Sequence, residues 1–311
     1  MDKKRDQGSM LILTMVVLTA LLGIGALSTD MAVLYVEKSN LQNAADASAL
    51  AGAQELPGKP QSAYSIADQY ASSNHTALSA IKISSNNKEV LVTAQKEVPL
   101  YLARFFGISS KVVSAEARAA VLSAHSIKGV TPLSITMRDF VYGQEYTLKN
   151  APPAGENGWY GPVRLDGQGA STYEESLADG CTSPLSIGQI LEIENGNMSG
   201  PTKKGLENRL ASDHRIPKNT FENHDSNAPE IVYIPIVEIA ARDNSTVQEV
   251  KILGFAAFFI ENLTQSGNDC WITGRFLQII VSQGNETSPI LAGEDDPTND
   301  YGLYSVKLLM N

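Results

Sequence analysis

The feature that most constrains this chain is an uncharged apolar run near its N-terminus. Residues Met10–Leu27 form 18 consecutive positions without a charged side chain. As a helix, this run is about 27 Å long, close to the hydrocarbon thickness of a lipid bilayer. The sequence therefore predicts a transmembrane helix over residues 10–28. Its predicted lipid-facing and packing positions are Leu11, Leu18, Leu22 and Gly23.

The charges on either side of this run predict its orientation. Three basic residues precede it in a short tail, residues 1–9, whereas the first charge after it is the carboxylate of Asp30. Basic residues flanking a membrane helix mark its cytoplasmic side. We therefore expect a single-pass protein of the cytoplasmic membrane, with the N-terminus inside and the body outside.

A cleaved signal peptide is the main alternative to a permanent anchor. Ala26-Leu27-Ser28 is an acceptable small-x-small cleavage site after a short apolar region. However, residues 29–56 continue the helical pattern with no proline and a single glycine, Gly52. A removable leader gives the mature protein no reason to extend the same helix, so the anchor is favoured. Both interpretations export the body.

The outer part of this long helix carries small side chains at regular spacing. Leu34 and Leu41 lie seven residues apart, and Ala45, Ala49 and Ala53 follow at intervals of four. Small residues at this spacing allow another backbone to approach closely. Two partners remain open on the sequence: the outer domain of the same chain, or neighbouring subunits in a helical bundle.

The N-terminal block as a whole resembles the signature of TadE/TadG-like Flp pilus-assembly proteins. It has a glycine, Gly8, before the apolar helix, then Asp30 and Tyr35, and it closes with the string LQNAADASALAGA over Leu41–Ala53. The resemblance implies a membrane-anchored structural component of a Tad/Flp-type pilus or secretion apparatus. Its implied partners are other pilus-assembly proteins or pilin-like subunits, together with the lipid bilayer.

One departure from filament subunits bears on the branch of the family. Pseudopilins are cleaved after a glycine and usually carry glutamate five residues later, but here that position holds Leu13. The resemblance therefore favours the TadG-like branch, an assembly factor rather than a filament building block. Cleavage between Gly8 and Ser9 stays open.

The remainder of the chain predicts an α+β protein. Residues 57–125 are expected to form a small α/β unit that packs on the outer helix, in the manner of pilin-like proteins. Proline and glycine at residues 57–60 end the long helix. The predicted elements are helices at 62–73 and 98–107, and strands at 80–84, 90–94 and 112–122.

From residue 126 to residue 311 the sequence predicts a β-rich extracytoplasmic domain. Glycine, proline, asparagine and aspartate recur every few residues, and long apolar β-branched runs lie between them. We expect a sheet or a barrel closed by the C-terminal strand. The predicted strands are 230–239, 250–260, 271–282 and 301–310, with a short helix near 173–179.

The cysteines leave two alternatives open. Cys181 and Cys270 are the only two in the chain. Outside the cytoplasm they could form one long-range disulfide, or they could be two small buried thiols. The absence of a C-x-x-C pair argues against a structural zinc or iron–sulfur site.

Candidate chemistry is weak elsewhere, and we predict neither an enzyme nor a cofactor. Asp213-His214 and His224-Asp225 have ligand types suited to a divalent metal, and the acidic group Glu294–Asp296 with Asp300 has oxygens suited to calcium. Solvated loops explain both better, and a turn best explains residues 195–202, around Asn197. We therefore assign no metal site.

Charge distribution narrows the partners further. The net charge is −10, and residues 221–311 hold 13 acidic and 4 basic residues. Without a basic stripe, nucleic acid is not an expected partner. The favoured function is structural, with contacts to pilus and envelope components. The alternatives are an anchored adhesive or ligand-binding module that recognises a cell-wall or envelope polymer and, less favoured, an exported metal-dependent hydrolase.

Overall fold

In the computed structural model the chain forms two compact units. Unit 1 consists of Met1–Ala120 and Val306–Asn311, and unit 2 of Val121–Ser305. The residues that the structure describes are 3–136, 139–149, 160–244, 246–281 and 300–309.

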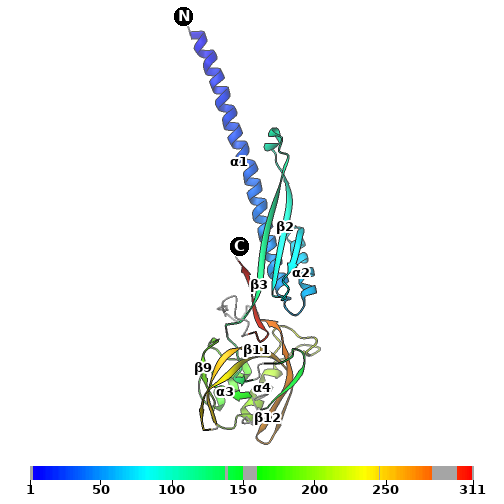
Figure 1. The fold of residues 1–311 in the computed structure, drawn as a ribbon, viewed down its shortest axis with the longest axis vertical. Coiled ribbons are helices and arrows are strands. Elements are labelled where there is room, and N and C mark those ends of the chain that lie inside the picture. The colour runs from blue at the N-terminus through cyan, green and yellow to red at the C-terminus, as the bar shows by residue number, and fades with distance from the viewer. Residues whose placement is uncertain (1–2, 137–138, 150–159, 245, 282–299, 310–311) are drawn as a thin grey trace. The chain divides into compact units, whose positions relative to one another are not determined.

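One helix dominates unit 1. Helix α1 runs without interruption over Lys3–Ala53, so the predicted membrane helix and the predicted outer helix are one element (Figure 1). The absence of proline and the predominance of good helix formers explain this continuity. A turn follows α1, and helix α2 (Pro60–Ser73) begins with a proline at its start, the helix position that tolerates one.

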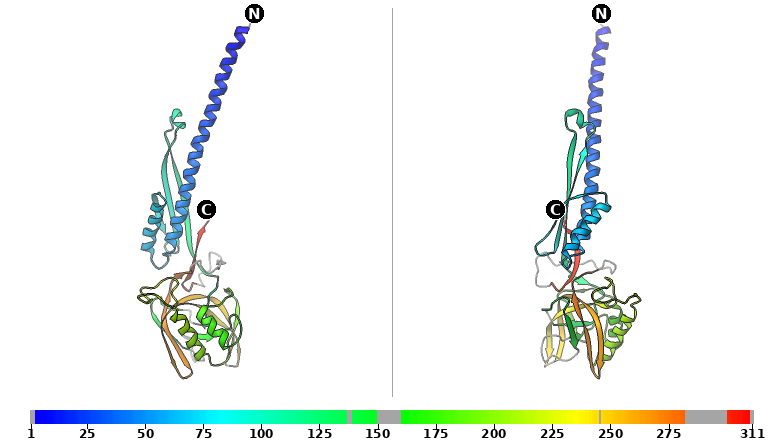
Figure 2. Two further views of the ribbon diagram at one scale, coloured as in Figure 1. Left: turned by 180° about the vertical axis from the view of Figure 1, so that it is seen from behind. Right: turned by 90° about the vertical axis from the view of Figure 1, so that its right-hand side faces the viewer.

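A long β-hairpin runs beside the C-terminal half of α1, as all views in Figures 1 and 2 show. Strand β1 (Leu78–Ile83) pairs with β2 (Glu89–Pro99), and β2 pairs with β3 (Ser110–Ser123), both antiparallel. The predicted helix over 98–107 is wrong. Only a single turn, η1 (Ala103–Phe106), forms at the hairpin tip, because its apolar residues face outward rather than onto a core.

The C-terminal strand does not close the β-rich domain as expected. Strand β14 (Leu303–Leu309) belongs to the sheet with the order β1-β2-β3-β14-β13, where β13 is Ile279–Ile280. The apolar pattern of a strand states which face is buried but does not specify its neighbour. The prediction therefore placed a strand correctly but assigned it to the wrong sheet.

Unit 2 is built on a seven-stranded sheet. Its order is β6-β12-β11-β10-β5-β7, and β9 pairs with β11 outside this path. Strands β10, β11 and β12 confirm the three predicted strands in this region, but with different bounds: β10 and β11 run past their predicted C-terminal ends, whereas β12 ends at Leu277, before its predicted end. The bounds are β5 Leu133–Ile135, β6 Glu145–Lys149, β7 Tyr160–Pro162, β9 Ile190–Glu192, β10 Ile231–Asp243, β11 Thr246–Ser266 and β12 Asp269–Leu277. A separate two-stranded sheet joins β4 (Ser126–Ile127) to β8 (Leu185–Ser186).

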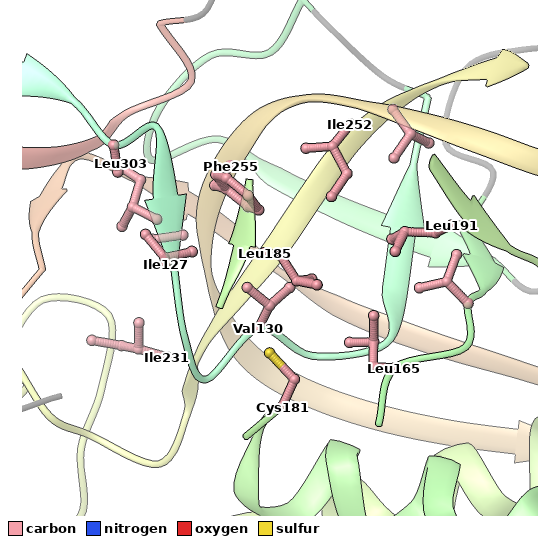
Figure 3. Close-up of a cluster of buried hydrophobic side chains, with 14 of the residues drawn as sticks. Ile127, Val130, Leu165, Cys181, Leu185, Leu191, Ile231, Ile252, Phe255 and Leu303 are labelled. Carbon is pink, nitrogen blue, oxygen red and sulfur yellow. The ribbon is translucent and has the colours of Figure 1, made fainter. Parts of the chain in front are cut away.

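Both faces of this sheet are covered by hydrophobic clusters. Successive side chains of a strand point to opposite faces, so one strand contributes to both clusters. On β11, Phe255 and Phe259 enter one hydrophobic cluster, whereas Phe258 and Ile260 enter the other. Figure 3 shows the first cluster, which includes Ile127, Val130, Leu185 and Leu303. The second cluster takes its cover from helices α3 (Ala170–Asp179) and α4 (Ser199–Ala211).

Helix α4 was not predicted, because its first turn contains Gly200 and Pro201 and reads as a loop. Proline is acceptable within the first turn, and a second glycine, Gly205, is required by packing. A Cβ atom there would lie 2.7 Å from the carbonyl oxygen of Glu174 on α3. The helix near residues 173–179, in contrast, is confirmed as α3.

Candidate functional site: the anchor helix and the hairpin it holds

The N-terminal half of α1 presents apolar side chains to its surroundings on all sides. The predicted positions Leu11, Leu18 and Leu22 are all more than half exposed, and Gly23 has no neighbour within 4 Å of where its Cβ would be. Within the described residues, Met10–Ala53 contains the single helix that is long and apolar enough to cross a membrane, with a mean hydropathy of 2.5 over its most apolar window. This surface is suited to hydrocarbon rather than to water.

Polar side chains within this half of α1 satisfy their own hydrogen bonds. The hydroxyls of Thr14 and Thr19 donate to the carbonyl oxygens of Met10 and Met15, both at 2.8 Å. Hydrogen bonding to the preceding turn removes the cost of an unpaired hydroxyl in a bilayer. Threonine is therefore compatible with the membrane interpretation.

The outer half of α1 packs its small residues against the same chain. The predicted positions Leu41, Ala45, Ala49 and Ala53 are buried, and Leu34 is half-buried. Of the two partners left open by the sequence, the structure therefore has the first. Alanines of α2 face this ridge, and all are fully buried: Ala63, Ala67 and Ala71.

Gly52 marks the closest approach in this packing. A Cβ atom at this position would lie 3.1 Å from the carbonyl oxygen of Ala63, 3.2 Å from Cβ of Ala67 and 3.6 Å from a methyl group of Val90. The ridge is thus occupied by α2 and β2, which leaves it no room for a neighbouring subunit.

Asp30 connects α1 to the tip of the β2–β3 hairpin. Its side chain is only 4% exposed. The carboxylate accepts hydrogen bonds from the backbone N–H groups of Tyr101 (2.9 Å), Leu102 (3.0 Å) and Ala103 (2.7 Å). Three converging N–H donors are a strong arrangement for an ionised carboxylate. We refer to this arrangement as the Asp30 clamp.

The hydrogen bonds of the clamp make the Asp30 carboxyl more acidic. The N–H of Ala103, with those of Tyr101 and Leu102, lowers the pKa of the Asp30 carboxyl below its ordinary value, and partial burial acts in the opposite direction. The folded structure therefore stabilises the ionised form of Asp30.

Three further side chains of α1 attach the hairpin along its length. Lys38 donates to the carbonyl oxygen of Ser114 (2.6 Å), and the side-chain amide of Gln42 donates to that of Glu116 (2.9 Å). Together with the ion pair of Lys96 and Glu37 at 2.8 Å, these contacts hold β2 and β3 beside α1 up to the Asp30 clamp.

The clamp leads to a prediction for Asp30→Asn. An amide has one acceptor oxygen and no charge, so it cannot replace three charge-assisted hydrogen bonds. We expect amide hydrogen exchange over residues 100–107 to accelerate by about tenfold or more. In the wild type the same protection should be complete at neutral pH and decline as the pH falls below about 4, because a lowered pKa stabilises only the ionised state.

Asp46→Asn is the matched control for this measurement. Asp46 lies on the same helix and accepts one hydrogen bond, from the side chain of Gln42 at 2.9 Å. Its replacement should leave exchange over 100–107 unchanged. Equal exchange in the Asp30→Asn variant and the wild type would show that the clamp does not hold the tip.

The two cysteines are buried thiols in this structure, the second of the alternatives left open. Cys181 lies in the first hydrophobic cluster of unit 2 (Figure 3). Its thiol donates to the carbonyl oxygen of Ser183. Cys270 is buried on β12, and no disulfide joins it to Cys181. Burial raises the pKa of the Cys181 thiol to about 11, so the unreactive protonated form predominates.

The residues considered for metal chemistry serve their own loops. The Asp213 carboxylate accepts from the backbone N–H of Arg215 (2.9 Å) and the amide of Asn219 (3.1 Å), and Nδ1 of His224 lies 2.8 Å from the carbonyl oxygen of Phe221. His214 is exposed. Among the residues that the structure describes, no group of three or more His, Cys, Asp or Glu side chains is placed to hold a metal ion.

Of the two other candidate loops, one lies wholly within the described residues and the other lies mostly outside them. Asn197 holds the start of α4, accepting from the N–H (3.0 Å) and the hydroxyl (2.6 Å) of Ser199. The acidic residues 294–296 lie outside the described residues. Asp300, which the calcium hypothesis included, lines a cavity of about 400 Å³ with Phe140 and Tyr142.

Sequence reasoning missed the clamp as a site. Asp30 appeared only as one position of the resemblance, because its partners lie 71 to 73 residues later in the chain. A carboxylate directly after an apolar helix, in a segment that is otherwise poor in charge, was the available signal.

The comparison with known families agrees with this geometry. The Tad family, described as Flp pilus-assembly TadE/G-like, matches residues 8–55. The match begins five residues after the start of α1 and ends two residues after its last residue, Ala53. The resemblance seen in the sequence is therefore confirmed over residues 8–55, most of which lie in α1. No curated protein and no solved structure matches the chain.

Proposed function

We propose that this TadE/G-like chain is a membrane-anchored assembly component of a Tad/Flp-type pilus or secretion apparatus, of the TadG-like branch. The observation that carries the proposal is the coincidence between the family match at residues 8–55 and α1. A single helix combines an exposed apolar half with a half that is packed into unit 1. Such a helix fixes the folded part of unit 1 at a defined distance from the membrane, because both are attached to one continuous element.

The packing of α1 supports an assembly factor over a filament subunit. A filament subunit uses one face of its long helix against neighbouring subunits, and small-residue ridges are suited to this purpose. Here Ala45, Ala49 and Gly52 are already buried within unit 1. Contacts with pilus components must therefore use other surfaces. Leu13, at the position where filament subunits carry glutamate, agrees with this assignment.

The topology belongs to the same proposal. With the basic residues of the tail inside, the part of unit 1 that follows the membrane helix lies outside the cytoplasmic membrane, together with unit 2. Protease added to cells with an opened outer envelope should then digest unit 2 and leave a short membrane-bound fragment. The extracytoplasmic body would meet pilin-like subunits and envelope polymers on that side. No covalent chemistry is assigned to it.

Deletion of the gene, followed by complementation, tests the function. We expect loss of surface pili on electron micrographs, restoration by the wild-type chain, and restoration by a variant with His214→Ala and His224→Ala. Failure of that variant alone would favour a metal-dependent enzyme. Pili that assemble in normal number but no longer attach would favour an adhesive module instead.

A further inference from the structure

The tip of the β2–β3 hairpin exposes an unusual group of side chains. Tyr101 is 64% exposed, Phe105 84%, Phe106 77% and Ile108 53%. Four large apolar side chains within eight residues form a patch that water solvates poorly. We call these four residues the aromatic tip.

The Asp30 clamp fixes the level of this tip relative to the anchor. Asp30 lies three residues beyond Leu27, the last residue of the apolar run, which is about 4.5 Å along the helix axis. The carboxylate binds the N–H groups of Tyr101, Leu102 and Ala103. The hairpin therefore turns at the point where α1 leaves the hydrocarbon. In Figures 1 and 2 its tip points toward the N-terminal end of α1.

The charge at the tip differs from the charge of the chain as a whole. Residues Leu100–Val112 include two basic residues, Arg104 and Lys111, and no acidic residue, although the chain carries a net charge of −10. Both basic side chains are exposed. Aromatic residues flanked by basic ones are the composition that binds the interface of a bilayer with anionic headgroups.

The exposed surface of α1 continues this patch past the membrane. Met31 is 66% exposed and Tyr35 is 77% exposed, one and two turns beyond Leu27. Tyrosine at this depth is typical of the headgroup region. Apolar surface thus continues from the membrane segment onto the next two turns of α1 and onto the hairpin tip.

From these observations we propose that the aromatic tip inserts into the outer leaflet of the same membrane, as a second contact of the chain with lipid. The helix and the tip, joined by the Asp30 clamp, would hold unit 1 at a defined tilt and rotation. A single helix leaves rotation about its own axis free, whereas two contacts do not. The inference rests on the membrane anchoring proposed above.

Fluorescence quenching by lipids tests this proposal on the full chain. Phe106→Trp keeps an aromatic side chain at the tip and places a reporter there. The variant is reconstituted in vesicles of phosphatidylcholine with phosphatidylglycerol, some containing acyl chains brominated near the headgroup. Emission of the wild type, which contains Trp159 and Trp271, is subtracted. We expect the brominated lipids to quench about half or more of the emission from the tryptophan at position 106, and this emission to shift to shorter wavelength.

Two reference variants separate the possible outcomes. Leu18→Trp lies in the apolar run and should be quenched by deeply brominated lipids, whereas Tyr70→Trp lies exposed on α2 and should not be quenched. Quenching at 18 without quenching at 106 would overturn the lipid contact and leave the tip for a protein partner. Absence of quenching at 18 would overturn the anchor itself.

Substitution of both phenylalanines gives a second, independent result. In a variant with Phe105→Ser and Phe106→Ser, the chain should remain membrane-bound through α1 and keep its Asp30 clamp. The tilt and rotation of unit 1 should instead become broader, visible as a wider distribution of spin-label distances from Tyr70→Cys to labelled lipid headgroups. An unchanged distribution would contradict a positioning role for the aromatic tip.

Discussion

Leucine at position 52 should destabilise unit 1 by about 2 kcal/mol or more. The higher helix propensity of leucine stabilises the helix by roughly 1 kcal/mol relative to glycine. Overpacking a rigid contact destabilises the fold by about 3 kcal/mol at the upper end of the usual range, and occasionally by more. The contact at Gly52 is of this rigid kind, since a Cβ atom alone would lie 3.1 Å from a backbone oxygen of α2 and 3.2 Å from the Ala67 side chain. A leucine must push α2 or β2 away, and steric cost exceeds propensity.

Hydrogen exchange of the full chain in detergent micelles measures this effect. Amides of α2 and β2 should lose at least tenfold of their protection, whereas those of the unit 2 strands should not change. Asn43→Leu is the matched control, because Asn43 is exposed on the same helix. Wild-type protection in the Gly52→Leu variant would show that α1 does not pack on α2 and β2 in solution.

A pair of arginines in the middle of the apolar run should remove the chain from the membrane. Ten Leu, Ile and Val residues lie in Met10–Leu27, and each favours insertion by about 0.3–0.6 kcal/mol, or about 3–6 kcal/mol together. Arginine opposes insertion by about 2.5–3.5 kcal/mol at the helix centre. Val17→Arg with Leu18→Arg therefore makes insertion unfavourable, and the carbonate-resistant membrane fraction should fall roughly tenfold.

Position along the helix provides the control. Met10→Arg with Leu11→Arg places the same two charges at the end of the run, where long side chains reach the headgroups at little cost. That variant should stay in the membrane fraction. If both pairs behave like the wild type, the apolar run does not span the bilayer. If both leave the membrane, depth within the helix is irrelevant and the anchor interpretation loses its support.

Periodicity and composition were sufficient for the long elements of the fold. Helix α1 follows from an uninterrupted pattern without proline, and strands β10 to β12 follow from β-branched apolar runs. Residues 98–107 misled the same reasoning, because Leu102, Phe105 and Phe106 have helical spacing while forming a hairpin tip. Periodicity identifies an apolar face but does not say whether that face meets protein or lipid. The partner of β14 was likewise beyond local reasoning, since strand pairing is a long-range choice.

The site divides in a similar way. The small residues Ala45, Ala49 and Ala53 were found from spacing alone, but spacing could not choose between packing within the chain and packing between subunits. The Asp30 clamp depends on amides more than 70 residues away and on a turn that sequence reasoning had made a helix. Only the folded structure identifies the clamp, because in the sequence Asp30 is simply a charged residue that follows the apolar run.

The mature N-terminus of the protein extracted from membranes tests the account most directly. Intact-mass measurement should give a chain that begins at Met1 or Asp2, because a permanent tether keeps the whole of α1. A chain that begins at Thr29 would contradict the account, since it would lack the apolar run and be a secreted protein. A chain that begins at Ser9 would show the processing of a pseudopilin and would turn the assembly factor into a filament subunit.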